Sequence, residues 1–400
     1  MKKCILFHLI LIIFAVFYIF STSFNCYQNN CYAQDDIEKE MSESIEKTLD
    51  EIDFSELENY LIDSGISEKF FDGKNVRELL ADILYGKLNL DIFSILQLIL
   101  NLSLKSIKSY LSALSVVLVI ILICFMFNKI KSNLQKESLE EIIYFVCFAA
   151  VVAILVNLSK GVIENATNSL VSMQKQMNIL FPILLTLMTG LGATNSVAAF
   201  TPMVSILSTL ISNIFVYLLV PMFFLIFTLL LINNLSKNTK FNKLIGFFKS
   251  LFKWITGVVF SVFFMYFSMQ AITVATTDGL TLKAAKFAIK NYVPLVGGYV
   301  SEGFEIAKAG LLLVKNSVGL VGVLIMLASV LSPVLLIAMF SLMLKFLAGI
   351  LEPLGDGKSV EILSSVADSF KLLLTCVFVV SVMYMLSVFL MISTVSGVGL

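Results

Sequence analysis

Histidine is almost absent from this sequence, and cysteine is scarce. The only histidine, His8, lies in an N-terminal stretch with the composition of a leader, and three of the six cysteines lie there too. The others, Cys124, Cys147 and Cys376, lie in long apolar runs. This inventory argues against a metal cluster, a disulfide framework and a Cys–His nucleophile. We therefore predict that the protein is not an enzyme, uses no cofactor and binds no nucleic acid.

A nucleotide-binding loop is incomplete as well. The run GDGKS at 355–359 resembles the end of a phosphate-binding P-loop. The glycine that the motif requires five positions before Gly357 is Glu352 here, and the run lies between apolar stretches instead of following a strand. Nucleotide binding is therefore not expected.

Charge is missing from one long block. Residues 176–236 contain no charged side chain in 61 positions. A spanning helix needs about 20 apolar residues, so this block holds two spans or three. Further apolar runs cover 111–127, 142–158, 254–276, 317–344 and 372–393. With 58% hydrophobic and 14% charged residues, the sequence predicts an all-α, polytopic helical membrane protein. We expect about 7–8 transmembrane helices after an N-terminal signal peptide.

Lysine placement favours three elements in the uncharged block. With three, the lysine-bearing loops 128–141, 233–253 and 345–371 share the cytoplasmic side, where positive charge is enriched. The loops 159–178 and 277–316 then lie on the opposite side. Glycine and proline supply helix breaks at several points. The candidate helix-break residues are Pro182, Gly190, Gly192, Pro202, Pro353 and Gly355.

Residues 1–33 have the layout of a secretory signal peptide. Lys2 and Lys3 provide the positive start, Cys4 to Phe20 the apolar stretch, and Cys31-Tyr32-Ala33 the cleavage site. An uncleaved anchor helix is the alternative. Either arrangement places the segment that follows outside the cytoplasm.

The segment after the leader is acidic, and the rest of the chain is basic. Gln34 to Asp91 contain 17 acids and 6 bases, whereas Ile92 to Leu400 contain 20 lysines and 11 acids. We therefore divide the chain into an acidic extracytoplasmic helical segment, 34–108, and a transmembrane domain, 109–400.

The acidic segment carries a thin apolar stripe. Its members recur every three to four residues and are Ile37, Met41, Ile45, Leu49 and Ile52. Cap-like pairs and glycines predict further short helices, at Ser55 with Glu58, Asn75 with Glu78, Gly65 and Gly86. Such a stripe cannot form an independent core, so it must pack on the membrane domain, a partner or another copy. A solvated acidic spacer is the alternative.

A polar segment between two apolar runs, 277–316, predicts an amphipathic helical hairpin. Asp278-Gly279 predicts a turn, Pro294 a break and Ser301 the cap of a second helix. Its candidate partner-facing or pore-facing residues are Thr277, Asp278, Gly279, Lys283, Lys286, Lys290, Asn291, Pro294, Lys315 and Asn316. The lysines can snorkel toward anionic lipid, dock an acidic partner or line a pore. Residues 233–253 mix phenylalanines with lysines, which suits membrane anchoring or contact with a motor ATPase.

Several short runs resemble the stage III sporulation protein AE family, over roughly residues 100–400. They include Phe181-Pro182, Leu184-Leu185-Thr186-Leu187-Met188, Phe200, Pro202, Thr277-Asp278-Gly279, Ala285-Lys286-Phe287, Leu312-Leu313 and Pro353-Leu354-Gly355. The family pattern lies in their order and spacing. The family has no established catalytic residues.

The resemblance implies a membrane component of a channel, or secretion-like conduit, between mother cell and forespore. It places the protein in the mother-cell membrane surrounding the forespore. It also implies other channel membrane subunits, a secretion-type ATPase and extracytoplasmic ring proteins as partners, besides the lipid bilayer. A stand-alone permease for a small solute and a non-conducting membrane scaffold remain the alternatives.

Overall fold

The structure is a computed structural model. It describes residues 35–71, 73–85, 114–123, 137–235, 241–292, 297–354 and 357–394, with positions 112 and 126. Helix is the only regular secondary structure within these ranges, so the predicted all-α class is confirmed. The predicted signal peptide at 1–33 lies outside the described residues.

Four short helices precede a bundle of long ones. The short helices are α2 (Asp35–Glu51), α3 (Ser55–Asp63), α4 (Ile66–Phe70) and α5 (Val76–Leu84). The long elements are α7 (Glu137–Gly190), α8 (Thr194–Leu210), the π-helix η1 (Ile211–Leu219), α9 (Val220–Leu235), α10 (Asn242–Tyr292), α11 (Gly297–Leu351) and α12 (Gly357–Ser393), with a 3₁₀ turn η2 (Glu352–Leu354).

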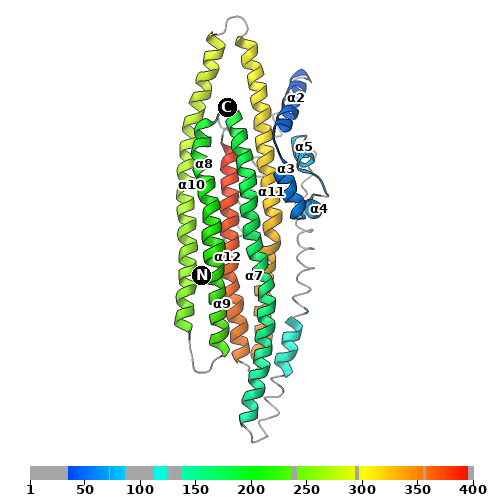
Figure 1. The fold of residues 1–400 in the computed structure, drawn as a ribbon, viewed down its shortest axis with the longest axis vertical. Helices are drawn as coiled ribbons and strands as arrows, with labels where there is room; N and C mark the ends of the chain where they lie inside the picture. The colour runs from blue at the N-terminus through cyan, green and yellow to red at the C-terminus, as the bar shows by residue number, and fades with distance from the viewer. Residues whose placement is uncertain are drawn as a thin grey trace.

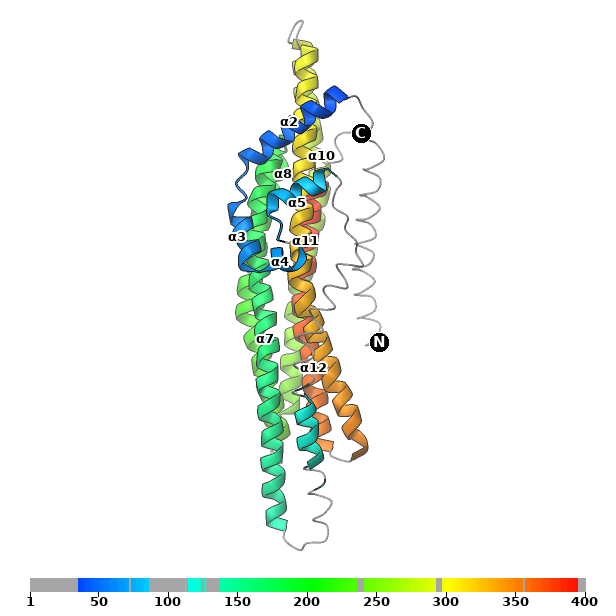
Figure 2. The ribbon, with the colours of Figure 1, turned by 90° about the vertical axis from the view of Figure 1, so that its right-hand side faces the viewer.

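The long helices lie side by side and alternate in direction (Figures 1 and 2). The starts of α7, α10 and α12 and the ends of α9 and α11 lie toward the end drawn at the bottom of Figure 1. The end of α10 and the start of α11 lie at the opposite end. The described parts of the lysine-bearing segments 233–253 and 345–371 therefore lie toward one end of the bundle, and their cytoplasmic side stays a prediction.

Within the described residues, five helical stretches are long and apolar enough to cross a membrane. They are Ala149–Gly190, Thr194–Asn233, Asn242–Gln270, Ile306–Leu351 and Ser359–Ser393, and a shorter apolar helix covers Leu114–Ile123. The structure therefore supports a polytopic membrane protein but not the predicted count of 7–8 spans. Two predicted divisions are absent. α7 is continuous where the sequence predicts a loop at 159–178, and α8, η1 and α9 follow one another directly, so the uncharged block contains one turn.

That turn uses the predicted glycines. α7 ends at Gly190, and Gly192 adopts a left-handed conformation with φ 77°, which glycine tolerates without strain. The amide of Gly192 donates to the carbonyl of Thr189, and that of Ala193 to the carbonyl of Met188. These bonds satisfy two of the carbonyls that a helix end leaves unpaired.

Two predicted proline breaks are wrong. Pro182 lies inside α7 and Pro202 inside α8. Both helices continue because neighbouring groups in a membrane bundle can satisfy the backbone carbonyl that a proline leaves without a donor. Pro353 lies in η2, between the end of α11 and the start of α12, and Gly355 lies outside the described residues.

A π-helix precedes Pro221. The amide of Val220 donates to the carbonyl of Phe215, five residues earlier. In a regular α-helix the ring of Pro221 would crowd the carbonyl of Tyr217. We attribute the wider π turns to this proline, which alters the long apolar segment without dividing it.

The structure differs from the predicted hairpin at 277–316 in the first part of that segment. α10 runs unbroken through Asp278 and Gly279, so the predicted turn is wrong. A single glycine costs a helix only about 1 kcal/mol, which a long apolar helix offsets. α10 ends and α11 begins on either side of the predicted break at Pro294, a position outside the described residues. Ser301 lies within α11, which begins at Gly297, and is therefore not a cap.

The acidic helices pack on the bundle, along the upper part of α7 and α11 in Figure 2. Ile45 of the predicted stripe and Leu57 of α3 are buried. The Tyr60 hydroxyl lies 2.8 Å from that of Ser172 in α7, within hydrogen-bond distance. Of the partners predicted for the stripe, the structure therefore supplies the membrane domain of the same chain.

The caps of the acidic helices match the sequence in part. Asn75 forms a capping box with Glu78: its side chain accepts from the Glu78 amide at 2.8 Å, and the Glu78 carboxylate accepts from the Asn75 amide at 3.1 Å. Ser55 is the first residue of α3 and its side chain caps nothing; its amide donates to Asp53 Oδ1 at 2.9 Å. Gly65 follows α3 with φ 61°, as predicted, and Gly86 lies outside the described residues.

Helix α11 contacts its neighbours at glycines. A Cβ atom on Gly319 would overlap Ile392 of α12, and one on Gly322 would overlap Leu180 of α7. Small residues at such contacts let helix backbones approach closely, which strengthens packing inside a membrane. These glycines therefore set the spacing of the bundle.

We predict that Gly322→Ala destabilises the protein by about 1–3 kcal/mol, because the added methyl group overlaps a fully buried leucine in a close-packed interior. Gly349→Ala in the same helix is the matched control, since a Cβ there meets nothing within 4 Å. Chemical unfolding in detergent measures both. Equal unfolding free energies for the two variants would contradict the packing argument.

Candidate functional site

Most predicted site residues lie at the upper ends of α10 and α11. Thr277 to Asn291 occupy the last turns of α10, and their side chains lie outside the description. Because α10 is continuous there, Lys283, Lys286 and Lys290 keep the spacing that puts them on one helix face. That these three lysines face a partner or a pore stays a prediction.

Lys315 forms hydrogen bonds with the end of α12. Its side chain is fully buried, and its ammonium group donates to the carbonyl of Ile392 at 2.9 Å and to that of Thr394. Carbonyls in the last turn of a helix have no amide partner within the helix, and a cation there complements the helix dipole. The structure thus gives Lys315, predicted to face a partner or a pore, a capping role inside the chain.

Asn316 and Gln176 place amide groups inside the bundle. The side-chain amide of Gln176 donates to the carbonyl of Gly322 at 2.9 Å, which links α7 to α11. Gln176 Oε1 and Asn316 Oδ1 are both buried. Amides in such positions typically connect neighbouring membrane helices. The Asn316 oxygen therefore lies within the bundle and not on its surface.

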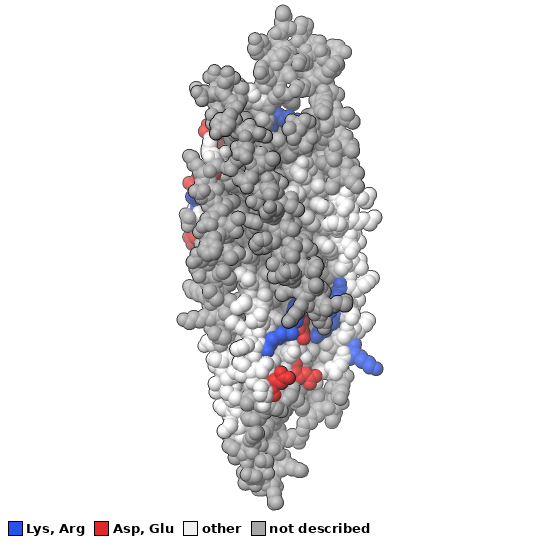
Figure 3. All heavy atoms as spheres, turned by 180° about the vertical axis from the view of Figure 1, so that it is seen from behind, with Lys and Arg blue, Asp and Glu red and all other residues white. Residues whose placement is uncertain are grey.

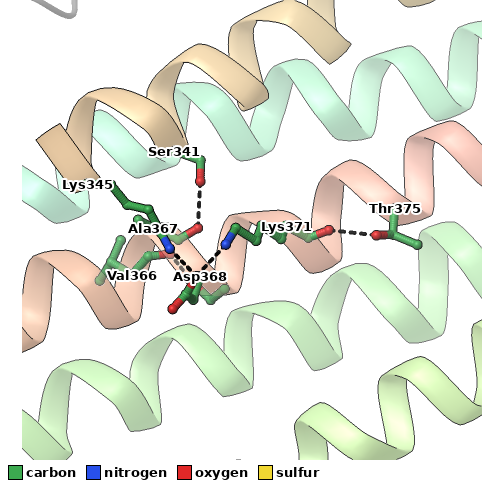
Figure 4. Close-up of polar contacts among 8 residues, drawn as sticks. Ser341, Lys345, Val366, Ala367, Asp368, Lys371 and Thr375 are labelled. Atoms are coloured by element: carbon green, nitrogen blue, oxygen red, sulfur yellow. Dashed lines mark hydrogen bonds and ion pairs between the residues drawn. The ribbon is translucent and has the colours of Figure 1, made fainter. Parts of the chain in front are cut away.

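A charged cluster joins α11 to α12 near the lower end (Figure 4). Asp368 Oδ1 lies 2.8 Å from Lys345 Nζ and 2.7 Å from Lys371 Nζ. The Ser341 hydroxyl donates to the carbonyl of Ala367 at 2.8 Å and holds the two helices together beside the cluster. Because the three charged side chains are 42–53% exposed, the ion pairs are accessible from outside the bundle.

Sequence reasoning missed this cluster. Asp368 and Lys371 are three residues apart, a spacing that predicts a shared helix face. Lys345 directly follows the apolar run 317–344, so it marks the end of that run. Its pairing with Asp368 depends on the contact between α11 and α12, which the spacing of residues does not reveal.

The exposed surfaces of α7 and α10 differ in polarity. From Asn157 to its end, α7 exposes no large hydrophobic side chain. Its exposed polar and charged residues there are Asn157, Lys160, Glu164, Asn165, Asn168, Lys175, Asn178, Thr186 and Thr189. By contrast, α10 exposes Trp254, Val258, Val262, Phe264, Met265 and Met269. The α10 face suits lipid, whereas the α7 face suits water or another protein.

The polar surface continues onto the next helix. Thr201, Ser205, Thr209 and Asn213 are exposed at intervals of four along α8 and η1. The Ser208 hydroxyl donates to Asn178 Oδ1 at 2.7 Å and connects α8 with α7.

Among the described residues, no group of three or more His, Cys, Asp or Glu side chains is placed to hold a metal ion.

We predict that Lys315→Met destabilises the last turn of α12, because two buried carbonyls lose their donor, at a cost of about 1–3 kcal/mol. Hydrogen exchange of the amides near Ile392 should accelerate. Lys175→Met, an exposed lysine on α7, is the control and should leave that exchange unchanged. Unaltered exchange in the Lys315 variant would argue against the capping role.

Comparison of the sequence with known proteins identifies relatives of this chain. A family model described as Stage III sporulation protein AE (spore_III_AE) matches residues 74–395, which include α5 and all the long helices. Among curated proteins, Stage III sporulation protein AE of Bacillus subtilis (strain 168) is 25% identical over 292 residues, 71% of this chain and 73% of the relative. No solved structure matches. Because the family model covers well over half of the sequence, the chain belongs to the stage III sporulation protein AE family.

Proposed function

We propose that this chain is an integral membrane component of the channel between mother cell and forespore, required for endospore development after engulfment. Family membership supports a role in sporulation, and the five long apolar helices support a membrane protein. The observation that carries the proposal is the extent of the family match. It runs through the whole bundle, so the part shared with this sporulation family is the membrane-spanning body itself.

The length of the helices supports a role in an assembly. At 1.5 Å per residue, the 54 residues of α7 extend about 81 Å, and the 55 residues of α11 about 82 Å. The hydrocarbon core of a bilayer is about 30 Å thick. Large parts of the bundle therefore project beyond the hydrocarbon, where they offer surfaces to other subunits.

The two ends of the bundle differ in a way that suits the proposed partners. The acidic helices α2 to α5 lie toward one end, where extracytoplasmic ring proteins would meet them. The described lysines Lys249, Lys253, Lys345 and Lys371 lie toward the other end, where a secretion-type ATPase or the cytoplasmic leaflet would meet them. The location that we propose, the mother-cell membrane surrounding the forespore, is the one that the family resemblance implies.

We predict that an in-frame deletion stops sporulation after engulfment, with few heat-resistant spores and recovery on complementation. A tagged copy purified from sporulating cells in mild detergent should retain other channel subunits, identified by mass spectrometry. Normal sporulation of the deletion strain would refute the proposal. Recovery of the tagged protein alone, with solute flux in liposomes, would favour a stand-alone permease.

At residue level, we predict that Lys283→Glu combined with Lys286→Glu impairs spore formation without preventing membrane insertion. The apolar stretches supply most of the insertion energy, whereas the charge reversal changes one face of the projecting end of α10. Spore counts and membrane fractionation measure the two effects. Loss of the protein from the membrane fraction would identify these lysines as topology determinants instead.

A further inference from the structure

The cluster between α10, α11 and α12 has more positive than negative charge. Asp368 is the carboxylate of both ion pairs, with Lys345 and with Lys371. Lys249 of α10 also interacts electrostatically with Asp368, and Lys253 lies one turn farther along α10, within range of Lys249. Three ammonium groups thus interact with one carboxylate and a fourth lies near Lys249, which leaves a net charge of about +3 to be balanced by an anion.

Other carboxylates of these helices lie farther away. Glu352 follows Lys345 by seven residues, and Glu361 precedes Asp368 by seven, which corresponds to about 10 Å along a helix. Both lie on the side of the α11–α12 connection. At that separation, close to the Debye length at physiological ionic strength, they compensate the lysines weakly.

The surroundings of the cluster are apolar and exposed. Leu342, three residues before Lys345, is 62% exposed, and Phe346, directly after it, is 68% exposed; Trp254, next to Lys253, is 64% exposed. Seen from behind, the lower half of the molecule has a group of basic and acidic side chains within a largely uncharged surface (Figure 3). All four lysines belong to stretches with the length and composition of membrane spans.

This combination points to one class of ligand. Lysines near the end of an apolar span extend their ammonium groups toward lipid headgroups, and basic pockets between membrane helices bind anionic headgroups. An acidic soluble protein would match the charge but not the exposed leucine, phenylalanine and tryptophan beside it. We propose that the cluster of Lys249, Lys253, Lys345 and Lys371 binds the phosphate headgroup of an anionic phospholipid, whose acyl chains lie along these apolar side chains.

The binding test uses the purified full-length protein in a neutral detergent, titrated with phosphatidylglycerol or phosphatidylcholine and followed by native mass spectrometry. Phosphatidylglycerol should bind more tightly. Lys249→Gln with Lys253→Gln should weaken it roughly thirtyfold, since each lysine near a lipid headgroup contributes about fivefold. This variant keeps both ion pairs of Asp368, so the contact between α11 and α12 is preserved.

Two further variants sharpen the result. Lys160→Gln with Lys175→Gln removes the same charge from the exposed face of α7 and should leave phosphatidylglycerol binding unchanged. Asp368→Asn removes the competing carboxylate and should strengthen binding severalfold. The Lys249/Lys253 variant should bind phosphatidylglycerol more weakly and the Asp368 variant more tightly. General loss of structure would weaken binding in both, so the pair of results distinguishes the two explanations.

Three results would overturn the proposal. Equal affinity for phosphatidylglycerol and phosphatidylcholine would exclude recognition of negative charge. Full competition by inorganic phosphate at lipid-like affinity would identify a free phosphate as the ligand. Displacement of bound phosphatidylglycerol by polyglutamate, with the apolar side chains Leu342 and Phe346 replaceable by serine at no loss, would identify an acidic protein instead. None of these outcomes depends on the proposed role in sporulation.

Discussion

The closeness of α11 to its neighbours is the constraint on which the bundle depends. α7, α12 and α2 each meet this helix at a glycine: Gly322, Gly319 and Gly310 in turn. In lipid, helices gain little from hiding apolar surface from each other, so close backbone contact and interhelical hydrogen bonds must supply the association. The bond from Gln176 to the Gly322 carbonyl is possible because no side chain separates the two backbones there. One helix therefore positions the membrane body and the acidic segment together.

Lys315 and Lys345, both in α11, have opposite surroundings. Lys315 is buried, and two carbonyls at the end of α12 accept hydrogen bonds from its ammonium group, so its charge is satisfied within the chain. Lys345 is exposed and shares its carboxylate with Lys371, so positive charge remains unmatched on the surface. A buried cation without partners would be costly, which makes Lys315 a structural residue. An exposed cation in excess attracts anions, which makes Lys345 a candidate for binding.

Some local signals in the sequence predicted local structure, whereas Pro182, Pro202 and the Asp278-Gly279 pair predicted breaks at which the helices continue. The turn at Gly190 and Gly192, the capping box at Asn75 and the apolar stripe of α2 depend on neighbouring residues, and each was predictable for that reason. The continuity of α7 was not predictable, because charges at Lys160 and Glu164 suggest a loop, whereas a helix that projects from the membrane can carry them. The cluster around Asp368 was missed because it depends on which helices pack together. The role of Lys315 was mistaken for the same reason.

The contrast between α7 and α10 connects the fold to the proposed function. A membrane protein that acts alone is expected to present apolar side chains to lipid around its whole girth. α10 does so with Trp254, Val262 and Met265, but α7 presents asparagine, threonine and charged side chains along most of its length. Covering such a face with hydrocarbon would leave many hydrogen-bonding groups without partners. In a bundle with one apolar face and one polar face, the hydrogen-bonding groups of the polar face find partners when that face meets water or another subunit. A channel assembly provides this arrangement.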